Sequence, residues 1–223
     1  MPLFYQQDIN ANTKLGIWKI SENEDFFLQK VPQHRDITHP HKRLQHLAGR
    51  FVLQELYPDF PYALIRIADT RKPFLSNEAY HFSISHCADY AAAIVSIDQR
   101  VGIDVELTTS KMERIAPKFL HPDERQLLED TKALLHSRFT DHPLNKDQWL
   151  LHTLFWSAKE AVYKWFGLGG IQFNEQIIFT GIELHQPGVI HCFFKHEIQL
   201  PVTVSYKVFD NLCVSWVDND YTG

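Results

Sequence analysis

The alternation of apolar and polar positions along the chain predicts a mixed protein of helices and short strands. Strand-like runs occur at residues 13–20, 63–67, 81–86, 90–98 and 101–106, and more strands and turns follow from residue 170. Helical spacing of apolar residues marks residues 42–56 and 149–167, with shorter helices at 110–120 and 121–130. Residues 131–148 are less regular, and a soft boundary falls near residues 98–100 without an obvious linker or readable internal repeat.

Two acids stand on the same face of one strand, "VGIDVE" at residues 101–106. Side chains alternate along a strand, so Asp104 and Glu106 share one face, with Cα atoms about 6.6 Å apart. Val101, Ile103 and Val105 share the opposite face. Like charges that close repel unless water or a cation lies between them. We expect the acids to lie on a face that is not core, with something between them.

The helix "FWSAKEAVYKWFG" at residues 155–167 adds a third acid. Trp156, Glu160 and Lys164 lie together on one side, while Lys159 flanks the apolar stripe. Alone, Glu160 and Lys164 are typical of a surface ion pair, and Lys159 of a side chain that reaches past apolar neighbours to solvent. Combined with the strand, the three acids supply hard oxygen ligands of the kind that Mg²⁺ prefers, with water and substrate phosphate as further ligands.

Composition excludes several classes of protein. The 223 residues and 26.1 kDa suit one large domain or two small ones, and 44% hydrophobic with 22% charged residues is typical of soluble proteins. A net charge of −5 argues against a globally basic nucleic-acid binder. Three cysteines without paired spacing indicate free thiols in a reducing compartment. No secretory leader or apolar run of membrane-spanning length is apparent, so we expect a cytoplasmic protein.

Thirteen histidines raise the question of a transition-metal site, especially at "THPHKRLQH". His39, His41 and His46 have no cysteine nearby, and their spacing matches no structural zinc pattern. A solvated helix entrance is the favoured interpretation. The chain also lacks a phosphate-cradling glycine loop and a G-x-S-x-G nucleophile turn.

Six segments resemble motifs of one family. "GIDVE", followed some fifty residues later by "WSAKEAVYK", is similar to the signature pair of the 4′-phosphopantetheinyl transferases. The closer resemblance is to the larger, monomeric class that acts on fatty-acid, polyketide and nonribosomal-peptide carrier proteins. "RKPFL" resembles that family's basic-proline motif, and "HFSISH" its F-N-x-S-H motif, with Ser83 where asparagine is usual. "LAGRFVLQEL" and "HPDERQLL" resemble its early helix and a helix start near the reaction centre.

The resemblance implies an α/β (α+β) pseudo-dimer of two similar subdomains, each a small antiparallel sheet packed on a long helix. Residues 1–100 would form the N-terminal subdomain with the coenzyme A (CoA) phosphate contacts. Residues 101–223 would form the C-terminal subdomain with the metal ligands and the catalytic helix. The reaction implied is transfer of the 4′-phosphopantetheine arm of CoA to a carrier-protein serine, which releases adenosine 3′,5′-bisphosphate.

Site residues follow from the matching motif positions. The resemblance implies that Asp104, Glu106 and Glu160 bind Mg²⁺. It implies that Glu160 or Glu124 accepts the serine proton, and that Lys164 lies by the pyrophosphate and assists departure of the leaving group. The CoA-binding residues implied in the same way are Arg43, Arg50, Lys72, Ser85, His86, Lys159 and Lys164.

Carrier proteins of this family's reactions are usually acidic around the modified serine. Lys111, Arg114 and Lys118 share one face of the helix at residues 110–120 and form a candidate docking patch. A solvated face without a partner fits the same pattern, because charged outward faces are the default.

Two other functions compete with the transferase. The acid cluster alone would permit a generic Mg²⁺-dependent phosphodiesterase or pyrophosphatase, but no other segment resembles a hydrolase. A non-catalytic scaffold that binds CoA or a carrier is disfavoured, because every charged position of the two main motifs is present.

Overall fold

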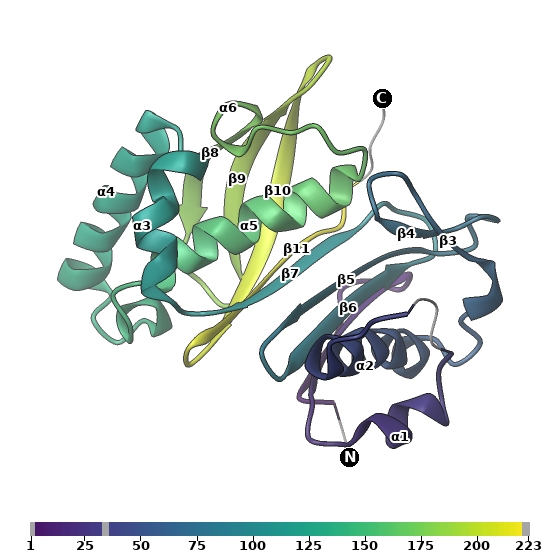
Figure 1. Cartoon of the computed structure of the whole chain (residues 1–223). Coiled ribbons are helices and arrows are strands. Elements are labelled where there is room, and N and C mark those ends of the chain that lie inside the picture. Colours follow the sequence, from purple (N-terminus) through teal and green to yellow (C-terminus); the bar gives the residue numbers. More distant parts are fainter. Residues whose placement is uncertain (1–2, 33–35, 220–223) are drawn as a thin grey trace.

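Two antiparallel sheets pack against each other in the computed structural model, which describes residues 3–32 and 36–219, and a long helix covers the outer face of each (Figure 1). The mixed α/β class expected from the sequence is therefore confirmed. That the two halves are similar, and that they divide near residue 100, stay predictions.

The first sheet has four strands in the order β1-β2-β6-β5. These are β1 (Tyr5–Asp8), β2 (Thr13–Lys19), β5 (His81–Cys87) and β6 (Tyr90–Ser96). Helices α1 (Glu24–Leu28) and α2 (Pro40–Leu56) follow β2. A 3₁₀ turn (Tyr62–Leu64) then leads into a two-stranded ribbon of β3 (Ile65–Ile67) and β4 (Pro73–Leu75).

The second sheet has five strands in the order β7-β11-β10-β9-β8. These are β7 (Gly102–Leu107), β8 (Ile177–Glu183), β9 (Gly188–Lys195), β10 (Gln199–Phe209) and β11 (Leu212–Val217). Between β7 and β8 lie α3 (Ser110–Phe119), α4 (Pro122–Arg138), a 3₁₀ turn (Pro143–Asn145), α5 (Leu150–Phe166) and α6 (Phe173–Gln176). Among the described residues, none of the helices is both long and apolar enough to cross a membrane.

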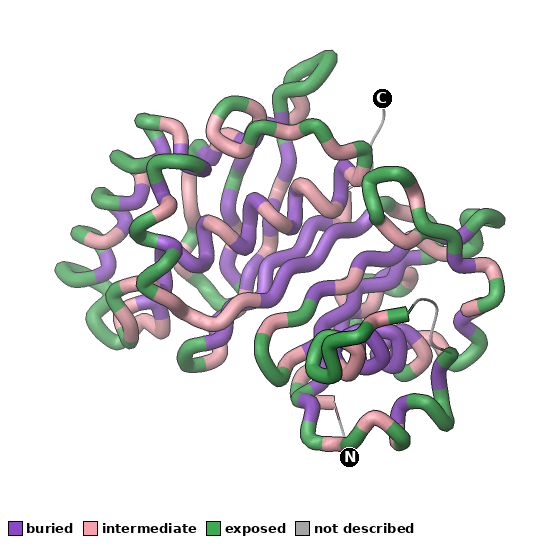
Figure 2. The backbone as a smooth tube through the Cα atoms, in the orientation of Figure 1, coloured by how far each residue is buried: buried purple, intermediate pink, exposed green. Residues whose placement is uncertain are grey.

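Three apolar clusters hold these layers together, and Figure 2 shows the buried backbone concentrated in the central strands and the long helices. One cluster lies under α2 and another under α5. The third lies between the sheets and joins residues of β2 and β6 to residues of β7 and β11, including Ile94, Ile103 and Val214. The order is thus helix, sheet, sheet, helix, and burial of apolar surface in each layer is the main stabilising contribution.

Helix α5 and the second sheet lie very close together at Gly102. A β-carbon there would lie 2.1 Å from the carbonyl oxygen of Ala161 and 2.5 Å from the amide nitrogen of Trp165. Only glycine permits this contact, so β7 runs directly beneath α5. The helix ends at Gly167, whose φ of 76° suits a residue without a side chain.

The helix predicted at residues 121–130 is longer in the structure. α4 continues to Arg138 and includes residues 131–138, which the sequence pattern leaves irregular. Its buried residues are only Glu124, Leu128, Thr131 and Leu135. A stripe that narrow, with two polar members, gives a weak helical signal even though it anchors the helix.

Candidate active site

Asp104 and Glu106 point from β7 toward α5, as the alternation of the strand predicts, and both line a cavity of about 390 Å³. Glu160 and Lys164 of α5 line the same cavity. We call it the acid cavity. The face is not open, however, because Asp104 is only 3% exposed. The expectation that Asp104 lies outside the core is therefore wrong, since α5 covers this part of the strand.

A small hydrogen-bonded group holds Asp104 in place. Its Oδ1 atom accepts hydrogen bonds from Ser85 Oγ at 2.8 Å and from Lys164 Nζ at 2.6 Å. Lys164 Nζ also donates to Ser85 Oγ at 2.9 Å. Asp104 Oδ2 is buried and has no hydrogen-bond partner among the residues that the structure describes. One carboxylate oxygen is therefore fixed, and the other is left for a ligand.

Burial and neighbouring charge raise the pKa values of Glu106 and Glu160. Burial, and then the charge of Asp104, raises the pKa of Glu160 from 4.5 to about 7. Burial, and then the same charge, also raises the pKa of Glu106. Trp156 Nε1 donates a hydrogen bond to Glu106 Oε1 at 3.3 Å. Three carboxylates thus share one cavity with a single lysine, an arrangement that favours binding of a further cation.

The donor set suits a hard divalent ion, although the ligand geometry is not preformed. Carboxylate oxygens are the ligands that Mg²⁺ prefers, and Asp104 Oδ2 is a buried acceptor that lacks a donor. Within residues 3–32 and 36–219, no three His, Cys, Asp or Glu side chains are placed to hold a metal as they stand. The residues therefore offer the type of ligand that Mg²⁺ prefers, but their side chains are not arranged as a complete coordination shell in this structure.

A second cavity, of about 130 Å³, is basic. His46, Arg50, Arg71 and His86 line it, and an Arg50 Nη1 atom lies 3.0 Å from His46 Nδ1. This basic cavity shares His86 and Ile84 with the acid cavity, so the two are neighbours. Its lining is suited to an anionic group.

A third cavity, of about 220 Å³, adjoins both of the others. Thr70, Arg71 and Lys164 are among its lining residues, and it also contains Ile84. All three cavities meet at Ile84, between β5, α5 and the loop that precedes β4. We call these three adjoining cavities together the groove, and they offer space for an elongated ligand with several anionic groups.

Most of the residues expected from the sequence come together here. The structure places Asp104, Glu106, Glu160, Lys164, Ser85 and His86 around the acid cavity, and Arg50 in the basic cavity.

Arg43 is placed elsewhere. It lies at the start of α2, where its guanidinium donates to both carboxylate oxygens of Glu24 at 2.6 and 2.9 Å and to the carbonyl of Ile37. Arg43 therefore anchors α1 to α2, and it does not line any of the three cavities.

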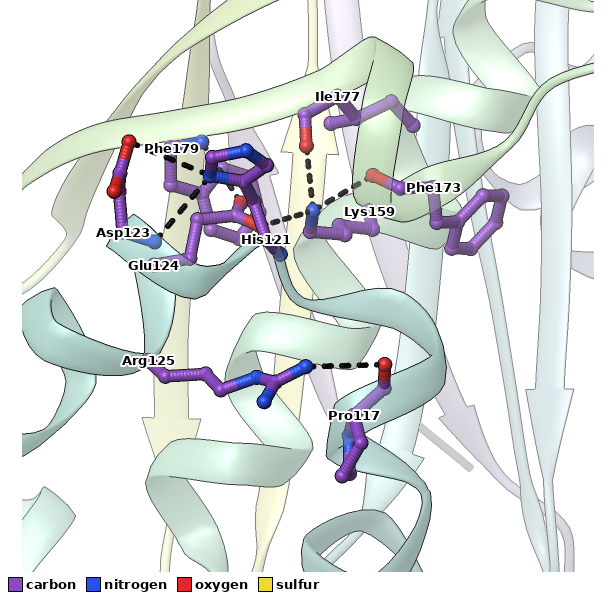
Figure 3. A network of polar contacts seen from close by, with 9 residues as sticks. All are labelled: Pro117, His121, Asp123, Glu124, Arg125, Lys159, Phe173, Ile177 and Phe179. Carbon is purple, nitrogen blue, oxygen red and sulfur yellow. Dashed lines mark hydrogen bonds and ion pairs between the residues drawn. The ribbon is translucent and has the colours of Figure 1, made fainter.

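Lys159 also lies outside the groove. Its side chain is fully buried, and its Nζ atom donates to Glu124 Oε2 at 2.7 Å, to the carbonyl of Phe173 at 2.8 Å and to the carbonyl of Ile177 (Figure 3). All three ammonium protons are thus in use. Burial lowers the pKa of Lys159 to about 8, while Glu124 acts in the opposite direction.

Glu124 is the partner of Lys159 and is equally buried. It also accepts hydrogen bonds from the backbone amides of His121 at 2.6 Å and Phe179 at 2.8 Å. The first of these closes the capping box of α4. The position of this pair does not favour Glu124 as a proton acceptor or Lys159 as a CoA ligand, because neither residue lines any of the three cavities described above.

Ser83 and Lys72 each join two elements of the fold. Ser83 Oγ accepts a hydrogen bond from the amide of Ile103 at 3.2 Å, so β5 and β7 are joined through this side chain. Lys72 lines the third cavity, but its Nζ atom donates to the carbonyl of Lys164 and, at 3.4 Å, to that of Trp165.

Sequence reasoning gave no site role to three residues that line the cavities, namely Arg71, His46 and Trp156. Each had a local signal. Arg71 precedes Lys72 in the basic-proline segment, whereas His46 and Trp156 lie one helical turn before Arg50 and Glu160. Residues one turn apart share a helix face.

A family model described as the 4′-phosphopantetheinyl transferase superfamily matches residues 100–217. The matched region contains the three acids and Lys164. Arg50, Ser85 and His86 lie before it.

Several curated proteins are similar to part of the chain. Enterobactin synthase component D of Salmonella typhi is 34% identical over 128 residues, which cover 56% of this chain and 48% of that protein. Mouse L-aminoadipate-semialdehyde dehydrogenase-phosphopantetheinyl transferase is 29% identical over 134 residues, or 55% of this chain and 42% of that protein. Enterobactin synthase component D of Escherichia coli K12 is 30% identical over 139 residues, 60% of each chain. The chain spans about half the length of the curated relatives that it matches.

Proposed function

The chain belongs to the 4′-phosphopantetheinyl transferase superfamily, and we propose that it transfers the 4′-phosphopantetheine arm of CoA to a serine of a carrier protein. Adenosine 3′,5′-bisphosphate is the second product. The observation that carries this proposal is the convergence of Asp104, Glu106 and Glu160 with Lys164 in one cavity, beside a basic cavity.

The groove supports a defined placement of CoA. The pyrophosphate lies at the acid cavity, where Lys164 and a divalent ion can offset its charge. The nucleotide end lies toward the basic cavity, where Arg50 and His86 face an anionic group. Ser85 donates a hydrogen bond to Asp104 and accepts one from Lys164. These bonds fix both side chains beside the pyrophosphate end of CoA.

Asp104, Glu106 and Glu160 would hold the Mg²⁺ ion, which supplies Lewis-acid stabilisation of charge on the pyrophosphate. In the reaction the carrier serine oxygen forms a bond to the β-phosphorus of the pyrophosphate. The bond from that phosphorus to the bridging oxygen breaks, and the bisphosphate leaves with the electron pair. Lys164 lies where it can stabilise the departing charge.

Glu160 is the better candidate for the proton acceptor. It lines the acid cavity, where the carrier serine and the pyrophosphate meet in the proposed reaction, and a carboxylate within hydrogen-bond reach of the serine can accept its proton. Glu124 is less suited, because both its oxygens are already bonded inside the protein.

A carrier protein has a suitable surface beside the acid cavity. An apolar groove of about 510 Å³ is lined by Ile115, Lys118, Phe119 and Trp156, among others. Trp156 also lines the acid cavity, so the two are adjacent. Lys111 and Arg114, both exposed, extend the basic side of α3. An acidic partner with a few apolar residues around its serine fits this surface.

One experiment tests the proposal. The protein is incubated with CoA, Mg²⁺ and an apo carrier protein, and the carrier is weighed by mass spectrometry. We expect its mass to increase by one phosphopantetheine arm. Cleavage of CoA without modification of the carrier would favour a phosphodiesterase or pyrophosphatase instead, and binding without any reaction would favour a scaffold.

A further inference from the structure

We propose that Arg71, rather than Lys72, is the residue of the "RKP" segment that binds a phosphate group of CoA, and that Lys72 fixes the turn from which Arg71 projects. The inference rests on the proposed function and adds to it a residue that determines recognition of the nucleotide phosphate.

Lys72 is already engaged by the end of α5. Its Nζ atom donates to the carbonyls of Lys164 and Trp165, which lie in the last turn of the helix. Such carbonyls lack partners within the helix and carry partial negative charge, so a cation there is stabilising. Burial lowers the pKa of Lys72 to about 8. Thr70 makes a second contact with the end of α5, because its Oγ1 atom donates a hydrogen bond to the carbonyl of Gly167 at 3.0 Å.

The turn at residues 68–72, which these two contacts hold against α5, places Arg71 in an uncommon backbone conformation. The amide of Arg71 donates to the carbonyl of Ala68 at 2.8 Å, and the amide of Ala68 donates to that of Lys72 at 2.9 Å. Arg71 consequently has a φ of 66°, in the left-handed region where glycine is favoured. A non-glycine residue persists there only when its surroundings determine the backbone. A positive φ at a residue other than glycine costs stability, and the presence of arginine here despite that cost points to a function of the Arg71 side chain.

The Arg71 side chain is free to bind a ligand. It is exposed, and the described residues offer it no hydrogen bond or ion pair. It lines both the basic cavity and the third cavity, and so lies at their junction. Among the described residues that line the basic cavity there is no aspartate or glutamate to compete with an anionic ligand for Arg71. A guanidinium can bind a phosphate through two parallel hydrogen bonds.

The chemistry of CoA identifies the phosphate. Its pyrophosphate must lie at the acid cavity for the transfer to occur. The one remaining phosphate is the monoester on the ribose, which then falls in the basic cavity. Arg71 therefore contacts the ribose 3′-phosphate, together with Arg50 and His86 of the same cavity.

The test compares CoA with 3′-dephospho-CoA as donors for the wild type and for Arg71→Ala, Arg71→Gly and Arg66→Ala. Arg66 is an exposed arginine of β3 that lines none of the three cavities, and so it is the matched control. We expect both Arg71 variants to raise KM for CoA about tenfold or more, with kcat little changed, because a charge-assisted hydrogen bond is lost. KM for dephospho-CoA should stay as in the wild type. Arg66→Ala should change neither.

Arg71→Gly separates binding from folding. Glycine accommodates the positive φ, so this variant should melt at or above the wild-type temperature and still lose affinity for CoA. An equal effect of the Arg71 variants on both donors, or no effect, would overturn the proposal. If the wild type transfers no arm to any carrier, the proposed function fails. Calorimetric binding of the same two nucleotides then still decides the role of Arg71.

Discussion

The Nζ atom of Lys164 lies 2.6 Å from Oδ1 of Asp104, and this contact joins α5 to β7 at the point where their acids meet. Because Ser85 also donates to Oδ1, Asp104 offers only its Oδ2 atom to an incoming ion. One buried carboxylate thus orients the lysine and, in the proposed reaction, binds the metal.

Replacement of Asp104 should abolish transfer without unfolding the protein. We choose Asp104→Asn rather than alanine, because the residue is buried and alanine would leave Ser85 and Lys164 without their acceptor. Loss of a metal ligand should lower kcat by at least about 100-fold. The exposed Asp59→Asn serves as a control for the same chemical change. Retained activity of folded Asp104→Asn at ordinary Mg²⁺ would remove Asp104 from the metal site.

The stability of the metal-free protein should fall as pH rises through neutrality. The pKa of Glu160 is raised from 4.5 to about 7, so the folded state holds this proton more tightly than the unfolded state does. The resulting stabilisation is fully present below about pH 4.5 and is lost as pH rises through about 7. Melting temperatures measured in chelator across this range should decline, and Glu160→Gln should flatten the decline.

Added Mg²⁺ should act in the opposite direction. Carboxylates must be deprotonated to bind the ion, so its effect on the melting temperature should be larger at about pH 8 than at about pH 5.5. A magnesium effect that does not depend on pH, or that is the same in Glu160→Gln, would contradict binding at the acid cavity.

The Glu124–Lys159 pair should prove structural. Removal of one partner leaves a buried charge uncompensated, so Glu124→Gln or Lys159→Met should each lower the free energy of unfolding by about 3–5 kcal/mol. The double variant should lose less than the sum of the two. Chemical denaturation measures this cycle, and transfer is assayed per folded molecule. A Glu124→Gln protein of normal stability that transfers nothing would instead support Glu124 as the proton acceptor.

Sequence periodicity predicted the faces on which the acids lie, because strand alternation and helix spacing determine the direction of each side chain relative to its near neighbours in the sequence. Asp104 and Glu106 fall on one face of β7, and Glu160 one turn before Lys164 on α5. Lys159 shows the limit of this reasoning. Neighbouring helix residues point about 100° apart, so Lys159 turns away from the groove and toward Glu124. Only the packing of α4 and β8 around α5 reveals that partner.

The two arginines of α2 show the same limit. Arg43 and Arg50 are two turns apart and share a helix face. Arg50 lies in the middle of α2 beside the basic cavity, whereas Arg43 lies near its start, where Glu24 of α1 binds it. No local pattern could distinguish them, because the difference comes from which other element reaches each side chain. The strands and the helices α2 and α5 were predictable, but the full length of α4 and the packing of one sheet on the other were not.

Ser83 should contribute to stability rather than to CoA binding. Its Oγ atom accepts from the buried amide of Ile103, and Ser83→Ala would leave that donor unsatisfied at a cost of about 1–3 kcal/mol. Ser83 also lines the third cavity, but its Oγ atom is engaged by the Ile103 amide, so we expect a lower melting temperature and an unchanged KM for CoA. Ser83→Asn, which restores the residue usual in the family motif, should recover part of the loss if its oxygen reaches the same amide. A KM effect at normal stability would show that Ser83 contacts the ligand.

The basic face of α3 should affect the carrier and not CoA. Reversing the charges of Lys111 and Arg114 places negative charge beside the apolar groove, so an acidic carrier is repelled and its KM should rise several-fold or more. The KM for CoA should not change, because neither residue lines its groove. As a control, reversing the charges of the exposed residues Arg138 and Lys195 gives a double variant with the same net charge as the first. It shows how much of the effect comes from long-range electrostatics. Since exposed charges are screened by salt, the defect should shrink as ionic strength rises. Carrier kinetics identical in the two double variants would mean that this face of α3 is simply solvated.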